Sequence, residues 1–223
     1  MKIKKSNWRR IGLLVVVIMI SGMVFTSLSE DLVNRETLST LDPVFGGWLI
    51  ARTSLSGDHV FSVITFLGNA LIISFGTGLL GFLLAKRKNW NKLILLFSVV
   101  GGSAMLNLLL KNIFQRSRPV FPQAFLVDTG YSFPSGHTMI SLAFYGVVAY
   151  IALIYIKSSY WKVLTVTGAL AISVLIGFSR LYLGVHYLTD VLAGWAAGGL
   201  WLAVCVLGDY WFQYLKPRKV DLR

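Results

Sequence analysis

The chain has 223 residues, of which 56% are hydrophobic and only 13% charged, and its mean hydropathy is +0.70. This composition excludes an ordinary soluble domain, because it arises from long uninterrupted apolar runs. The net charge of +12 could suggest a nucleic-acid partner. However, the basic residues stand at the ends of the apolar runs and form no single patch, which is typical of membrane topology signals and of contacts with anionic lipids.

Six apolar segments follow one another along the chain, and each is near or above the roughly 20 residues that cross a bilayer. They cover residues 11–29, 60–85, 93–114, 137–156, 162–183 and 187–214. Because the hydrocarbon contains no water, their backbone groups need internal partners, so each segment is expected to be a helix. The sequence therefore predicts an all-α integral membrane protein, in which six transmembrane helices form a single domain over residues 1–223.

The first segment and the loop after it are the least regular part of this pattern. Five basic residues precede the first apolar run, as in a secretory signal, but the run exceeds the usual signal core of 7–15 residues. We therefore expect a helix that is not cleaved. The loop at about 30–58 mixes large apolar and polar residues, which predicts a partly helical segment on the membrane surface.

Small and amide residues inside the apolar segments predict contacts between helices. Small residues recur at 193–194 and 197–199, a spacing that lets two helices approach closely. Packing inside the bundle is favoured over a dimer contact. Asn69 and Asn107 are expected to form hydrogen bonds between helices.

The distribution of basic residues predicts the orientation of the protein. If the N-terminus lies inside, 15 of the 21 Lys and Arg residues fall in the inner segments and six in the outer ones. The positive-inside rule then predicts that both termini lie in the cytoplasm. Three polar motifs, at 111–119, 132–137 and 179–190, consequently lie on the extracytoplasmic face.

In the last motif, His186 and Asp190 are four residues apart, on one face at the start of the final helix. The carboxylate can accept the Nδ1–H of the imidazole, which leaves Nε2 as a free lone pair. An oriented neutral imidazole beside cations is a nucleophile for phosphorus. On its own, the pair could equally be an ordinary contact at a helix start, and Arg180 could simply be a cation favoured at a helix C-terminus.

The middle motif, Pro134-Ser135-Gly136-His137, opens the fourth apolar segment. Ser132 or Ser135 can cap the helix, and the free N–H groups of its first turn can bind an anion. Gly136 lets the backbone approach that anion closely. His137 would lie beside the bound group, placed to act as an acid. Capping alone would explain Ser135, but not a histidine that enters the membrane.

The first motif supplies cations at the end of the third apolar segment. Lys111 and Arg118 are seven residues apart, and Pro119 follows. Arginine can bind two phosphate oxygens at once, and lysine supplies a point charge. A single cation at a helix end commonly snorkels to the interface, and Arg116 is assigned that role.

Neither a metal nor another cofactor is expected. Two histidines could ligate a metal ion, but the chain has only three, and no third acid or thiolate lies near them in the sequence. Asp190 is expected to be the only acid in the site, which leaves no carboxylate cluster for magnesium.

In this order the motifs closely resemble the signature of the type 2 phosphatidic acid phosphatase superfamily: Lys-x6-Arg-Pro, Pro-Ser-Gly-His and Ser-Arg-x5-His-x3-Asp. They stand without departure between residues 111 and 190, and the similarity to the family's bacterial membrane lipid phosphatases covers about 60–214. It implies that His186, oriented by Asp190, attacks phosphorus to form a phosphohistidine, while His137 protonates the leaving oxygen. The phosphoryl oxygens would be held by Lys111, Arg118, Arg180, the Ser135 hydroxyl and the Gly136 amide.

The resemblance implies a metal-independent phosphatase of lipid phosphates. Phosphatidylglycerol phosphate is the favoured substrate, with phosphatidic acid related to it, and undecaprenyl pyrophosphate is the alternative. A vanadate-dependent haloperoxidase uses a similar constellation, but those relatives are soluble. An anion transporter would need no paired nucleophile and acid, and inverted repeats would be expected. The expected partners are the lipid substrate and the bilayer, with neither nucleic acid nor an obligatory protein partner.

Overall fold

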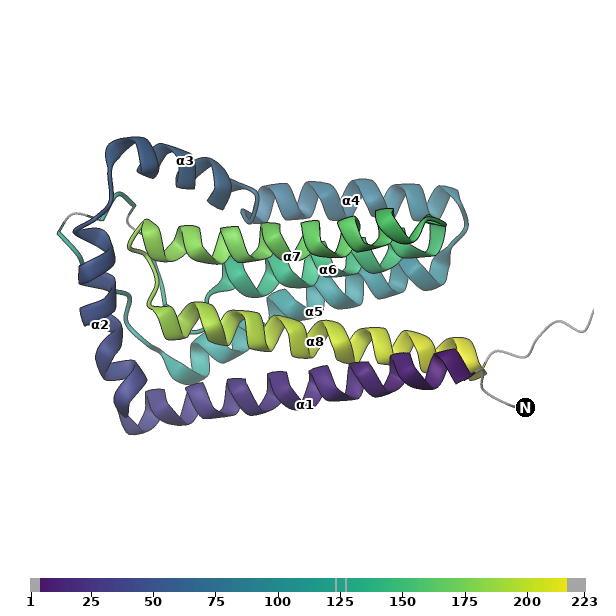
Figure 1. Cartoon of the computed structure of the whole chain (residues 1–223), viewed down its shortest axis with the longest axis horizontal. Coiled ribbons are helices and arrows are strands. Elements are labelled where there is room, and N and C mark those ends of the chain that lie inside the picture. Colours follow the sequence, from purple (N-terminus) through teal and green to yellow (C-terminus); the bar gives the residue numbers. More distant parts are fainter. Residues whose placement is uncertain (1–4, 123, 127, 216–223) are drawn as a thin grey trace, which may run out of the picture.

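The structure is a computed structural model that describes residues 5–122, 124–126 and 128–215. Within these ranges the chain forms eight helices and no strand (Figure 1). The helices are α1 (Lys5–Asn34), α2 (Thr37–Ile50), α3 (Leu55–Phe66), α4 (Ala70–Lys86), α5 (Trp90–Phe114), α6 (Gly136–Tyr155), α7 (Ser159–Tyr182) and α8 (Leu188–Leu215). Six segments are long and apolar enough to cross a membrane, with α3 and α4 together forming one of them. The predicted all-α bundle of six spans is therefore confirmed.

The second predicted segment, 60–85, is not one continuous helix. A turn at residues 67–69 separates α3 from α4, and Asn69 caps α4 by accepting the backbone N–H of Leu71 at 2.9 Å. The expectation that Asn69 bonds to another helix is therefore wrong. Gly68 occupies the turn because an added Cβ would lie 2.7 Å from Ile176 and 3.4 Å from the ring of His137. The break thus lies directly beside a predicted site residue.

The predicted surface segment is helical over most of its length. α1 runs along α8, and α2 then crosses the end of the bundle towards α3 (Figure 1). Leu41, Val44 and Trp48 of α2 are each more than half exposed. Asp31 anchors the start of α2, because its carboxylate accepts the backbone N–H groups of Leu38 and Ser39 at 3.0 and 2.6 Å.

Close packing of α8 against α6 explains the small residues of the last span. A Cβ added at Gly194 would lie 2.9 Å from the carbonyl oxygen of Ser135, and one at Gly198 would lie 2.6 Å from that of Met139. Only glycine allows this approach. The prediction of packing inside the bundle is confirmed, and the contact fixes the start of α8 against the start of α6.

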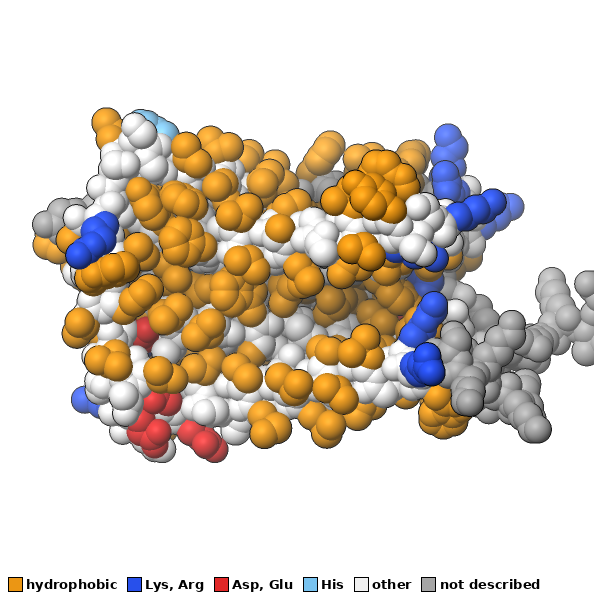
Figure 2. Space-filling model, in the orientation of Figure 1, with side chains coloured by type: hydrophobic (Ala, Val, Ile, Leu, Met, Phe, Trp, Pro, Cys, Tyr) orange, Lys and Arg blue, Asp and Glu red, His pale blue; other side chains and the backbone are white. Residues whose placement is uncertain are grey.

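The surface shows how the bundle would lie in a bilayer. Hydrophobic side chains cover the flank of the molecule, whereas Lys and Arg gather at the end that carries the N-terminus (Figure 2). At the same end, Lys92 and Asp209 form a buried ion pair, and the hydroxyl of Tyr150 donates to the same carboxylate at 2.7 Å. Several basic residues counted for the orientation, before residue 5 and after 215, lie outside the described residues, and the orientation itself stays a prediction.

The orientation can be tested with single cysteines in a Cys205→Ser background. Val120, 92% exposed, lies in the connection between α5 and α6, and Arg87 lies in the turn between α4 and α5 at the other end. We expect Val120→Cys to react with a membrane-impermeant thiol reagent in intact cells. Arg87→Cys should react only after permeabilisation, and the reverse labelling pattern would contradict the charge-based orientation.

Candidate active site

The three polar motifs meet at one end of the bundle. α5 and α7 end there, and α6 and α8 begin there (Figure 1). A cavity of about 350 Å³ opens between these ends, and it is lined by five of the eight predicted site residues: Lys111, Arg118, Gly136, His137 and His186. Arg180, Ser135 and Asp190 lie behind its wall, each almost completely buried.

The neighbours of His186 determine which tautomer it adopts. Its Nδ1 lies 3.2 Å from Oδ2 of Asp190, and its Nε2 lies 3.1 Å from Nη1 of Arg118. A guanidinium can only donate, so Nε2 must carry a lone pair and Nδ1 must carry the hydrogen. Burial lowers the pKa of His186 to about 4, although the Asp190 carboxylate acts in the opposite direction. The imidazole is therefore neutral near pH 7, with Nε2 as its available base.

Arg180 is held in place but is not saturated with hydrogen bonds. Its Nη1 donates to the hydroxyl of Thr65 at 3.0 Å, and its Nη2 donates to Asp128 at 2.7 Å. Its Nε–H is buried and has no partner among the described residues. A buried donor without a partner costs free energy, so this N–H is available to donate a hydrogen bond to a ligand oxygen.

Backbone carbonyls orient the other two cations. Nε of Arg118 donates to the carbonyls of Thr129 and Gly130, both at 3.1 Å. Nζ of Lys111 donates to the carbonyl of Tyr131 at 2.8 Å. These carbonyls are neutral acceptors, so they position the side chains without cancelling their charge. The cavity therefore presents preorganised positive charge, as an anion site requires.

The first turn of α6 differs in one respect from the prediction. Neither serine caps the helix through its side chain within the described residues: Ser135 makes no such bond, and the Ser132 hydroxyl donates to Ser117 at 3.1 Å. The backbone of Ser135 instead donates to the carbonyl of Asp190 at 3.0 Å. This bond ties the α6 start, which carries His137, to the α8 start.

Asn107 supports the same turn from α5. Its side-chain amide donates to the carbonyl of Pro134 at 3.2 Å, just before α6, and to Sδ of Met139 in α6 at 3.7 Å, so the predicted bond between helices is confirmed. A Cβ added at Gly136 would lie 2.9 Å from the Asn107 oxygen. A larger residue at 136 would therefore displace the Asn107 side chain that supports this turn.

Arg116 does not snorkel as predicted. Nη1 donates to Asp190 and Nη2 to Asp42, at 2.7 and 2.8 Å, and the guanidinium lies over the ring of Tyr187 at 4.2 Å. Burial lowers the pKa of Arg116, but the two carboxylates outweigh that effect and raise it. The assignment from sequence was wrong because both partners are 74 residues away along the chain.

Asp190 is not the only acid in the site, contrary to the prediction. Asp128 forms ion pairs with Arg180 at 2.7 Å and with Arg118 at 3.2 Å. Burial alone would raise the pKa of Asp128, but the two arginines outweigh it and hold that pKa below its usual value. The carboxylate therefore binds as an anion to two of the cations predicted to hold phosphate.

The additional acids do not create a metal site. In the part of the chain that the structure describes, no three His, Cys, Asp or Glu residues are grouped so that they could hold a metal ion. Asp128 and Asp42 are each paired with arginine. Independence from metal stays a prediction that needs a measurement.

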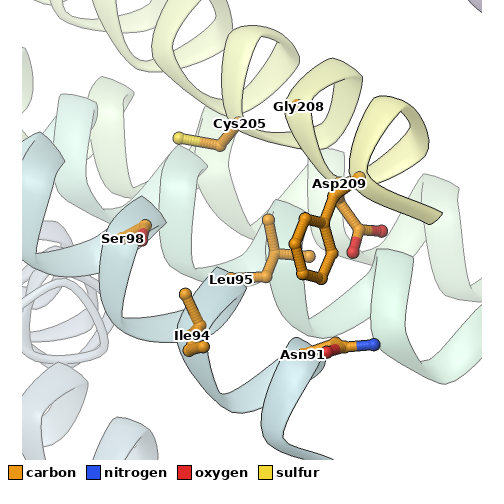
Figure 3. A pocket seen from close by; sticks show the side chains of 8 residues that line it. Asn91, Ile94, Leu95, Ser98, Cys205, Gly208 and Asp209 are labelled. Atoms are coloured by element: carbon orange, nitrogen blue, oxygen red, sulfur yellow. The ribbon is translucent and has the colours of Figure 1, made fainter. Parts of the chain in front are cut away.

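A second cavity, also about 350 Å³, lies between α5 and α8 at the opposite end of the bundle (Figure 3). Its only charged lining residue is Asp209, and Oδ2 of that residue already accepts bonds from Lys92, Tyr150 and Gln213. The rest of the lining consists mainly of apolar side chains. Among the described residues that line it, Cys205 carries a free thiol, but there is neither a histidine nor a cation. We therefore look for the chemistry in the cavity with the histidines.

Comparison with known proteins shows which proteins the chain is similar to. The sequence profile of the PAP2 superfamily matches residues 91–214. Phosphatidylglycerophosphatase B of Bacillus subtilis (strain 168) is 36% identical over 148 residues, which are 63% of this chain and 70% of that protein. An undecaprenyl-diphosphatase of Sulfolobus acidocaldarius is 37% identical over 75 residues, 34% of this chain and 32% of that one.

A solved structure extends the similarity to nearly the whole chain. It is the crystal structure of a transmembrane PAP2 type phosphatidylglycerolphosphate phosphatase from Bacillus subtilis, at 27% sequence identity and a TM-score of 0.76. The match covers 92% of this chain and 98% of that one.

The position of Asp128 leads to a prediction about anion affinity. Its carboxylate must leave Arg118 and Arg180 before a phosphate-like anion can bind them, so Asp128→Asn should bind orthovanadate more tightly than the wild type. Calorimetry on the purified protein measures this affinity, and Asp58→Asn, in the first turn of α3, is the matched control. Weaker vanadate binding by Asp128→Asn would show that the carboxylate is needed to hold the arginines in place.

Proposed function

The chain belongs to the PAP2 superfamily and is a membrane lipid phosphatase, and we propose that it hydrolyses phosphatidylglycerol phosphate through a phosphohistidine at His186. The observation that carries the mechanism is the position of the His186 imidazole between Asp190 and Arg118. Its Nδ1–H is directed at Asp190, and its Nε2 lone pair lies inside a cavity lined by cations. This arrangement supports nucleophilic attack on a phosphorus atom.

In the first step, the substrate phosphate takes the place of the Asp128 carboxylate. Arg118 turns from Nε2 of His186 to the phosphoryl oxygens, and the free Nε–H of Arg180 gains its acceptor. Lys111 and the Gly136 amide supply further donors. These groups stabilise the charge on the transferring phosphoryl group, as magnesium does in many other phosphoryl-transfer enzymes.

Attack by Nε2 then forms a nitrogen–phosphorus bond and breaks the bond between phosphorus and the leaving oxygen. The protonated imidazole of His137, in the first turn of α6, donates its proton to that oxygen and becomes neutral. The phosphorylated imidazole keeps its Nδ1–H and is cationic, so the ionised Asp190 stabilises it. In the second step, water attacks phosphorus with His137 as base, which releases phosphate and regenerates neutral His186.

The Ser135 hydroxyl has a less direct place in this scheme. It is completely buried, accepts a bond from Thr138 at 2.9 Å and does not line the cavity. It can reach a phosphoryl oxygen only if the first turn of α6 adjusts when substrate binds. Its predicted contact with phosphate stays a prediction.

The walls of the cavity support an amphiphilic substrate. Beyond the cations, the cavity is lined by Ile73 of α4, Val100 of α5 and Ile140 of α6. A lipid could therefore place its phosphate among the cations while its chains lie along the helices. This combination favours a lipid phosphatase over a haloperoxidase-like enzyme or an anion transporter, since neither needs a chain-binding wall beside a nucleophile.

The choice of phosphatidylglycerol phosphate is supported by the similarity to phosphatidylglycerophosphatase B, which is twice as long as the similarity to the undecaprenyl-diphosphatase. Phosphatidic acid carries the same kind of monoester and is a related substrate. Undecaprenyl pyrophosphate is the alternative. From the positive-inside rule, we propose that the site faces the extracytoplasmic side of the cytoplasmic membrane.

A substrate panel tests the proposed function. Purified protein in detergent should release phosphate from phosphatidylglycerol phosphate with the highest kcat/KM, from phosphatidic acid with a lower value, and from undecaprenyl pyrophosphate with the lowest. Excess EDTA should leave these rates unchanged, because cations of the protein take the place of a metal. A preference for the pyrophosphate would favour the alternative, and loss of activity that only magnesium restores would contradict the metal-free mechanism.

The roles of the two histidines can be distinguished by comparing substrates with different leaving groups. His186→Ala should lower kcat by on the order of 10⁴-fold or more for every substrate, because the nucleophile is gone. His137→Ala should lower kcat by about 10²–10⁴-fold for the lipid and much less for p-nitrophenyl phosphate, whose leaving group needs no proton. Asp190→Asn should lose less than His186→Ala. Near-normal turnover in His186→Ala, or equal losses for both substrates in His137→Ala, would refute these roles.

A further inference from the structure

The nucleophile is positioned by a chain of charges that extends beyond the three motifs. Asp190 is completely buried and binds through both carboxylate oxygens. Oδ2 accepts the Nδ1–H of His186 at 3.2 Å and the backbone N–H of Tyr187 at 3.0 Å, and Oδ1 accepts Nη1 of Arg116 at 2.7 Å. Rotation of the carboxylate away from the imidazole would break all three bonds.

Arg116 is itself held from the other side by Asp42 of α2. That carboxylate is 2% exposed and accepts Nη2 of Arg116 at 2.8 Å. It also accepts the hydroxyl and the backbone N–H of Thr189, the latter at 3.2 Å. Burial raises the pKa of Asp42, and the bonds from Thr189 and Arg116 act in the opposite direction. Because Arg116 and the backbone N–H of Thr189 can only donate, the contacts themselves are those of an ionised carboxylate.

The charges of this chain explain why a second acid is present. A lone guanidinium in contact with Asp190 would orient the carboxylate but would also cancel its charge in a buried, low-dielectric place. The imidazole would then lose the anion that stabilises its cationic, phosphorylated form. With Asp42 ionised, Arg116 and Asp42 are together neutral, so the negative charge of Asp190 remains available to His186.

We propose that Asp42 is a positioning residue for the reaction: it neutralises Arg116, so that Arg116 can fix the orientation of Asp190 without weakening it as the partner of His186. This inference rests on the proposed function, because it assigns His186 as the nucleophile. Asp42 itself lines no part of the cavity and touches no substrate. Through Arg116, it connects α2, which crosses the end of the bundle, to the carboxylate that orients His186.

The test compares Asp42→Asn with Asp31→Asn in the full-length protein purified in detergent. Both substitutions remove one buried carboxylate charge, from α2 at Asp42 and from the end of α1 at Asp31. Asp31 bonds the backbone at the start of α2 and makes no bond to Arg116 among the described residues. Asp42→Asn should lower kcat roughly tenfold, within the range expected for directly coupled residues, with KM unchanged. Asp31→Asn should keep the wild-type kcat when the assay is run at a temperature at which this variant is fully folded.

Comparing the loss of kcat between two leaving groups distinguishes a role in the reaction from a merely structural role. Because Asp42 acts on the nucleophile and not on the acid, the loss in Asp42→Asn should be equal for the lipid and for p-nitrophenyl phosphate, unlike the loss in His137→Ala. Thr189→Val, which removes one hydroxyl from the same cluster, should show the same equality with a smaller loss. It serves as the test variant if Asp42→Asn does not fold.

Several outcomes would overturn the inference: a kcat in Asp42→Asn equal to that of Asp31→Asn, a change confined to KM, or a loss that depends on the leaving group. The wild type in the same assay separates this failure from failure of the proposed function. A wild type that releases phosphate from no lipid phosphate refutes the function, whereas an active wild type with an unaffected Asp42→Asn refutes only the role of Asp42.

Discussion

The carboxylate of Asp190 lies completely buried at the start of α8, where an unpaired charge would cost several kcal/mol. It persists there because His186 and Arg116 donate to its two oxygens. Those bonds fix the imidazole, its tautomer and the direction of its Nε2 lone pair. The backbone carbonyl of the same residue accepts a bond from Ser135, so Asp190 aligns both the proposed nucleophile, His186, and the helix start that carries His137.

The surrounding cations impose a second constraint, because like charges in a low-dielectric cavity repel one another. The protein meets it with two kinds of anion. Asp42 is buried with Arg116, whereas Asp128 binds Arg118 and Arg180 at the edge of the cavity. We propose that the first pair positions Asp190 and that the second holds the place of the substrate. On this proposal, a phosphate enters a site whose donors are already positioned and displaces the Asp128 carboxylate.

Much of the site could be predicted from the sequence, because the motifs lie at helix ends where local spacing determines the geometry, as with His186 and Asp190. Apolar runs likewise predicted the six spans. The roles of Arg116 and Asp42 could not be predicted, since their contact joins residues 74 positions apart and no local pattern indicates it. The break before α4 could have been predicted from the sequence. Gly68 is a residue that breaks helices and Asn69 one that caps them, but averaging hydropathy over a long segment hides both signals.

Trapping the phosphorylated protein tests the nucleophile most directly. Purified protein would be mixed with substrate labelled in its terminal phosphate, quenched within one turnover, and digested to locate the label. The geometry predicts an acid-labile, base-stable phosphate on the peptide that contains His186, and none in His186→Ala. Label on any other residue, or turnover at the normal rate without labelled protein in the wild type, would contradict the role of His186 as nucleophile.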